Sequence, residues 1–160
     1  MADNRTIRVQ GIQDVQRSLK KLGQTSRQSR TAINKALRPA ANMLARGIQQ
    51  AYKEEFNSNS NYKRLSGRTP TWKTIGIITA RRSKEPGLFV GPIKRKTTPI
   101  RVKGKDSYNL AEMQIKGNKF QDARPDVFLA TAKKMDSQIY LQAEKDLDKL
   151  LDRMIKQAGF

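Results

Sequence analysis

The side chains best suited to binding chemistry in this chain are lysines and arginines concentrated in one segment. Residues 63–105 contain 13 basic residues and 1 acidic residue. Lysine and arginine contact nucleic-acid phosphates and release the counterions condensed on them. The predicted contacts are Lys63, Arg64, Arg68, Lys73, Arg81, Arg82, Lys94, Arg95, Lys96, Arg101, Lys103 and Lys105. The alternatives are an acidic partner protein, or lysines that prevent edge-to-edge strand pairing.

The distribution of charge indicates that this segment is a surface feature. The whole chain carries a net charge of +19, yet residues 106–160 hold 9 basic and 9 acidic residues. No groove-reading motif is present, so we expect contacts with phosphates rather than with base edges. Trp72, Tyr62 and Phe89 are candidates for stacking on bases, although a single tryptophan at the start of a strand more often belongs to the core.

The sequence offers few residues suited to catalysis or to metal binding. The chain contains neither cysteine nor histidine, which excludes disulfides, thiolate or imidazole metal sites and catalysis by either residue. Two pairs of neighbouring carboxylates, Glu54 with Glu55 and Asp146 with Asp148, fall in predicted helices, where such side chains diverge and are solvated. We therefore expect no enzymatic activity, no cofactor, no metal site and no small-molecule substrate.

The elements that must position the basic segment follow from apolar spacing. Thr6–Gln10 alternates apolar and polar residues like a short strand, and a short helix with Gly23 as its stop follows. A second helix begins at Thr25 or Ser26 and runs to about Phe56, with a kink or break near Leu37 caused by Pro39. Small residues on this helix, Gly47 among them, would let the C-terminal helix approach closely.

The second half of the chain contains a predicted β-hairpin and a long helix. Trp72–Arg82 and Leu88–Lys94 flank a turn at Pro86 and Gly87. Phe128–Phe160 has apolar residues three and four apart on one stripe, without proline or glycine before Gly159.

These elements predict one α+β domain over residues 1–160. A small antiparallel sheet, formed by the N-terminal strand and the hairpin, packs against the long second helix and the long C-terminal helix. Residues 57–71 and 95–107 are expected to be exposed basic or polar loops. No apolar run approaches the 18 or so residues that span a bilayer, and no secretory signal is recognisable. We therefore expect a soluble protein made in a cytoplasm, without membrane contact.

The order of elements resembles a family of long-tailed bacteriophage proteins. It is similar to the neck or tail-completion group that includes minor tail protein Z. The shared features are the strand IRVQG, the Ala-rich basic helix, the SGR loop, the hairpin and the ARP motif at Ala123–Pro125. Phe128, Leu129 and Ala132 continue the ARP motif, after Asp126 and Val127, which have no counterpart in the family pattern.

The resemblance implies a structural virion protein at the head-to-tail junction. Its copies would form a homo-oligomeric ring, six being the expected number, around the channel through which genomic DNA leaves. Its partners would be connector or head-closure proteins and tail terminator or tail-tube proteins. The basic segment would face DNA or an acidic neighbour.

A second hypothesis belongs to another class: a free, sequence-independent nucleic-acid-binding protein of the nucleoid or ribosomal type. A free binder should show tight, salt-dependent affinity as an isolated monomer. A neck component should bind weakly alone and assemble with its neighbours.

Overall fold

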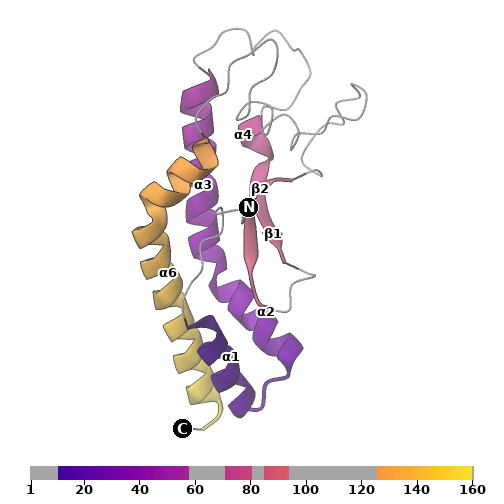
Figure 1. The fold of residues 1–160 in the computed structure, drawn as a ribbon. Helices are drawn as coiled ribbons and strands as arrows, with labels where there is room; N and C mark the ends of the chain where they lie inside the picture. Colours follow the sequence, from indigo (N-terminus) through magenta and orange to yellow (C-terminus); the bar gives the residue numbers. More distant parts are fainter. Residues whose placement is uncertain (1–10, 58–70, 81–84, 94–125, 160) are drawn as a thin grey trace.

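The computed structural model describes residues 11–57, 71–80, 85–93 and 126–159, which form an α+β fold with a long C-terminal helix (Figure 1). Helices predominate, and they lie on one side of a two-stranded antiparallel sheet. The fold class predicted from the sequence is confirmed. The predicted strand Thr6–Gln10, loop residues 58–70 and all of residues 95–107 lie outside the described residues.

The first two helices begin and end where their sequences indicate. α1 (Ile12–Lys21) buries Val15 and Leu19, and Gly23 follows it with φ +82°, a conformation that glycine adopts without strain. α2 (Ser26–Ala36) is capped by Thr25, whose side chain accepts a hydrogen bond from the backbone N–H of Gln28. The Gln28 side chain in turn accepts from the Thr25 N–H at 2.9 Å, which completes a capping box.

Pro39 produces the kink that the sequence predicts between α2 and α3 (Arg38–Asn57). Leu37 lies between the two helices in a turn, and Pro39 falls in the first turn of α3, where a missing N–H costs least. The N–H of Leu37 still donates to Ile33, and the N–H of Ala41 donates to the Leu37 carbonyl. These two bonds are kept on either side of Pro39, and Figure 1 shows the change of direction between α2 and α3.

The predicted hairpin is present, but its strands are shorter than predicted: Trp72, Ala80 and Ile93 lie outside them. β1 (Ile75–Thr79) and β2 (Leu88–Pro92) pair in antiparallel register, with Ile78 opposite Phe89. Trp72, predicted to open the first strand, belongs instead to the helical turn α4 (Thr71–Thr74). The prediction was wrong because β propensity at Trp72 is weaker than its tertiary packing against α3.

The C-terminal helix α6 (Val127–Gln157) confirms the predicted long amphipathic helix. Asp126, one of the two residues absent from the phage pattern, is its N-cap, and its carboxylate accepts from the Leu129 N–H at 3.0 Å. The buried residues are Val127, Thr131, Ile139, Ala143, Leu147 and Leu150. With half-buried Met135 between Thr131 and Ile139, these positions recur every three or four residues and form the face that meets the other helices.

α3 is the central layer of the molecule. Its main contacts are with α6 on one side and with the two strands on the other, while α1 and α2 pack beside the C-terminal half of α6 (Figure 1). One apolar cluster joins α1, α2, α3 and α6, and a second joins Ile48 and Tyr52 of α3 with Ile75 of β1 and Val127 of α6. Leu44 packs against both clusters, so the two are continuous through α3.

Gly47 allows α3 and α6 to approach closely, as the small residues of the sequence predict. A Cβ added there would overlap Sδ of Met135 and would lie 3.3 Å from Cγ2 of Thr131. The Met135 thioether therefore occupies the space that a side chain at position 47 would take.

We expect Gly47→Val to lower the free energy of unfolding by about 1 to 3 kcal/mol, the usual cost of overpacking. Urea denaturation would measure the loss. In a Met135→Ala background the same substitution should cost less, because the overlapping side chain is gone. Equal losses in both backgrounds would contradict the close contact.

Polar side chains of the helices hold the hairpin at several points. Arg30 of α2 donates from Nη2 to the Ala80 carbonyl, just beyond β1. Gln49 of α3 donates to the Ile75 carbonyl at 2.8 Å, at the start of β1. Gln13 of α1 donates to the Glu85 carboxylate at 2.9 Å, in the turn. The strand β1 is thus tied to the helical layer near both of its ends.

Adjacent glutamines allow a matched test of this attachment. Gln49→Ala should lower the free energy of unfolding by about 1 kcal/mol, because it removes a bond to a partly buried carbonyl. Gln50 is exposed and bonds only locally, to Glu54 on its own helix, so Gln50→Ala should change stability by less than about 0.5 kcal/mol. If the denaturation curves of the two variants coincide, the Gln49 bond contributes nothing to the free energy of unfolding.

Candidate nucleic-acid interface

Lys73 is the one predicted phosphate contact that lies within the described residues, and it belongs to α4. Its Nζ lies 5.3 Å from the centre of the Trp72 ring. A second ammonium, that of Lys53 near the end of α3, lies 5.8 Å from the same ring. Both are within the range in which a cation is attracted to the face of an indole, worth about 0.5 to 1 kcal/mol at exposed sites. Two lysine ammonium groups, one from α3 and one from α4, therefore lie near the same tryptophan ring.

Trp72 is held in place by the second apolar cluster. The indole is half-buried and packs against the cluster that contains Ile48 and Tyr52. The Tyr52 ring meets the Phe128 ring edge-on with centroids 5.2 Å apart, which fixes the start of α6 against the same part of α3. The indole thus packs against the core, the role that the sequence favoured over base stacking, and the ring also lies near two charged groups.

The two ammonium groups are exposed and are available to an anion. Neither Lys53 nor Lys73 is more than partly covered by protein, so each can exchange water for phosphate oxygens. Lysine contacts phosphate as a point charge and reads no base sequence. Such a pair suits a polyanion backbone and has no evident use in covalent chemistry.

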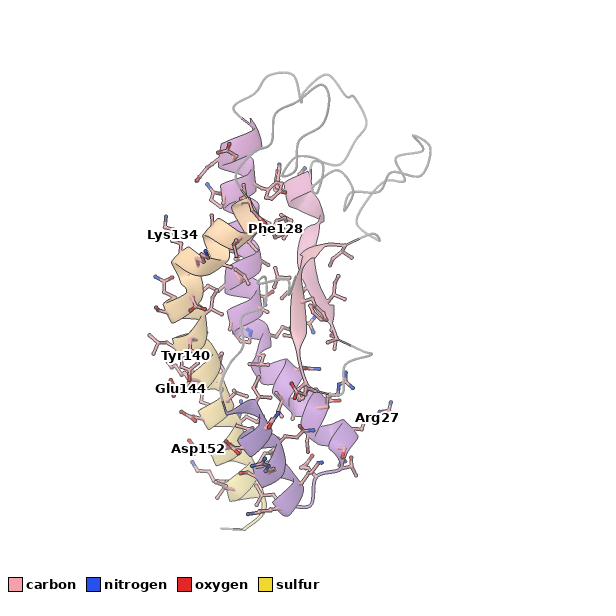
Figure 2. The ribbon with its side chains drawn as sticks, in the orientation of Figure 1. Arg27, Phe128, Lys134, Tyr140, Glu144 and Asp152 are labelled. Carbon is pink, nitrogen blue, oxygen red and sulfur yellow. The ribbon has the colours of Figure 1, made fainter. Side chains whose placement is uncertain are left out.

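The helices at the other end of the molecule carry further basic residues that the sequence analysis did not single out. Residues 12–57 hold 9 basic and 3 acidic residues. Exposed members on α1, α2 and α3 are Arg17, Lys20, Lys21, Arg27, Lys35, Arg38 and Arg46. Arg27 lies at the end opposite α4, pointing away from the protein (Figure 2). The excess of basic residues before residue 54 was the available signal, but no motif marked it.

One ion pair lies within α1. Arg17 Nη1 lies 3.1 Å from Asp14 Oδ1, and both side chains are mostly exposed. Exposed pairs of this kind contribute at most about 1 kcal/mol. Arg17 therefore stays accessible to a competing anion.

The remaining predicted contacts fall outside the described residues. They are Lys63, Arg64, Arg68, Arg81, Arg82, Lys94, Arg95, Lys96, Arg101, Lys103 and Lys105. Whether they join Lys73 in one surface stays a prediction.

The neighbouring carboxylates have local partners in the structure. Glu54 accepts a hydrogen bond from Gln50 at 2.7 Å, and Asp146 accepts one from Gln142 at 2.7 Å, each within one helix. Within the ranges that the structure describes, no three acidic, cysteine or histidine side chains are grouped as metal ligands would be. In the same ranges no helix has the length and apolar character of a membrane span.

Comparison of the chain with family models, with curated proteins and with solved structures found no significant match.

The only tryptophan of the chain makes the lysine pair testable by fluorescence. Adding a long inorganic polyphosphate should draw the two ammonium groups toward phosphate and change the Trp72 emission, with half-saturation at higher polyphosphate concentration as salt rises. The double variant Lys53→Gln, Lys73→Gln should show a smaller change. Its matched control is Lys145→Gln, Lys149→Gln on α6, which removes the same charge far from the indole. Equal responses from the two double variants would exclude this site.

Proposed function

We propose that the chain is a structural, non-enzymatic protein whose basic surface contacts the phosphate backbone of DNA without reading its sequence. The observation that carries the proposal is the segregation of charge. Exposed basic residues predominate on α1 and α2 and beside Trp72, whereas α3 carries 3 basic and 2 acidic residues and α6 carries 6 basic and 5 acidic residues. A charge needed only for solubility would have no reason to avoid the longest exposed helix.

We propose that the protein is located at the head-to-tail neck of a long-tailed phage. The sequence motifs that resemble the phage family support this proposal. The order of elements in the structure, a helix, a kinked basic helix, a hairpin and a long helix, agrees with that resemblance. In this role a ring of copies would join connector or head-closure proteins to tail terminator or tail-tube proteins, and DNA would pass along the basic surface. A highly charged small protein gains from such an assembly, because its charges meet a polyanion.

The alternative is a free nucleic-acid-binding protein, and the same basic surface would serve it. The two proposals differ in where the protein is found and in how tightly the isolated chain binds. A virion component is retained in purified particles at the neck, while a free binder stays with host nucleic acid.

A pair of triple variants tests the DNA contact. Arg27, Lys35 and Arg38 are changed to glutamine in one variant, and Lys133, Lys145 and Lys149 of α6 in the other, so both lose the same charge. Each true phosphate contact that is lost should lower the magnitude of the slope of log affinity against log salt by about 0.9. Fluorescence anisotropy with duplexes of two unrelated sequences would measure it.

The α2–α3 variant should bind both duplexes equally weakly, and the α6 variant should keep most of the original slope. Slopes lowered to the same extent in both variants would mean that net charge alone drives binding, and would contradict a defined surface. Labelling of the protein in purified particles, followed by electron microscopy, would locate it. If it is missing from the particles, the neck proposal is wrong and the free binder is favoured.

A further inference from the structure

The indole of Trp72 is fixed at the edge of the core. Trp72 lies in α4, which contacts α3 and leads directly into β1. The half-buried ring packs against the cluster that contains Ile48, Tyr52 and Ile75, all of which are almost completely buried. Because such a core is close-packed, the ring cannot move far without opening the cluster. The part of the indole that is not buried is therefore a rigid surface.

Two flexible side chains meet this rigid ring from different elements. Lys53 Nζ, from α3, lies 5.8 Å from the ring centre, and Lys73 Nζ, from α4, lies 5.3 Å from it. Both distances fall within the range of about 6 Å in which the face of an indole attracts a cation. Lysine otherwise has a flexible stem with large rotamer entropy. The ring therefore restricts two exposed ammonium groups that would move freely without it.

This restriction favours the binding of phosphate. A mobile lysine loses rotamer freedom when it contacts a ligand, whereas a lysine that is already restricted loses less. An ammonium group has three N–H donors, so it can stay beside the ring and still donate to phosphate oxygens on its solvent side. The two like charges also repel each other, and an anion bound to both offsets that repulsion.

The same contacts oppose stacking of the indole on a base. Trp72 was one of the stacking candidates in the sequence, because aromatic rings serve single-strand binding in that way. In the structure one part of the ring packs against the core, and two ammonium groups lie over it. A base that stacked there would have to displace a cation that the ring attracts. Contact with phosphates is therefore favoured over contact with bases.

We propose that Trp72 is a positioning residue, whose ring holds the ammonium groups of Lys53 and Lys73 in place for phosphates and itself contacts no base. This inference rests on the proposed function and adds that this site recognises phosphate alone. A cation–π contact at an exposed site corresponds to roughly a two- to fivefold change in an equilibrium constant. Loss of the ring's attraction should therefore lower affinity while the number of phosphate contacts stays the same.

Fluorinated tryptophans test the ring with little change in its shape. The chain has a single tryptophan, so biosynthetic incorporation of analogues with increasing numbers of fluorine atoms changes position 72 alone. Fluorine withdraws electron density from the face of the ring and weakens its attraction for cations. Calorimetric titrations with long inorganic polyphosphate and with single-stranded DNA should show affinity falling stepwise, by roughly two- to fivefold for each ammonium group. The slope of log affinity against log salt should not change, because no phosphate contact is lost.

The matched control is the same series in the Lys53→Gln, Lys73→Gln variant. Fluorine should have no effect on affinity there, although the ring and its packing are the same. Trp72→Phe and Trp72→Leu give a second comparison, in which phenylalanine keeps an aromatic face and should bind polyphosphate more tightly than leucine. Thermal melting verifies that each protein folds.

Three outcomes would overturn this role of Trp72. The first is an affinity for polyphosphate that is constant across the fluorinated series. The second is a fall in affinity that persists in the Lys53→Gln, Lys73→Gln variant, which would mean that the ring acts independently of the lysines. The third is a fall for single-stranded DNA without one for polyphosphate, which would show that the indole stacks on bases.

Failure of this role can be told apart from failure of the proposed function. If the unmodified protein binds duplex DNA with a salt-dependent affinity that fluorine does not change, the role of Trp72 is wrong and the proposed function stands. If the unmodified protein binds neither polyphosphate nor DNA, both are wrong.

Discussion

The close contact between α3 and α6 is the constraint on which the rest of the structure depends. α3 is the central element: α6 covers one side of it and the hairpin covers the other. Gly47 permits the contact by omitting a side chain where Met135 and Thr131 approach. If α6 stood further away, Val127 and Phe128 would leave the cluster that holds Trp72 and Ile75. The position of the candidate interface therefore depends on packing on the other side of α3.

Helices were predictable because their signals are local. A helix start at Thr25 or Ser26, the stop at Gly23 and the kink at Pro39 can each be recognised within a few residues of sequence. The hairpin was predictable from its turn, but its first boundary was not. Whether Trp72 continues a strand or forms a helical turn depends on the surface of α3, which the sequence near Trp72 does not specify.

The candidate interface was less predictable, because its partners come from distant parts of the chain. Lys53 and Lys73 are separated by the whole segment between α3 and α4, and their common position over one indole follows from the fold. The bonds from Arg30 and Gln49 to the ends of β1 likewise join residues 50 and 26 positions apart. Charge counting already showed that residues 106–160 are balanced, but only the fold brings Lys53 and Lys73 to the same ring.

Charge also limits how copies of this chain can associate. Each copy carries +19, so any symmetric contact that pairs equivalent basic surfaces works against Coulomb repulsion. In the proposed function, the phosphate backbone would lie along the side where α1 and α2 hold 6 basic residues and 1 acidic residue, away from α6, whose 6 basic and 5 acidic residues nearly balance. A phosphate backbone bound along the basic side would screen the repulsion that remains between neighbouring copies, so each interaction would strengthen the other.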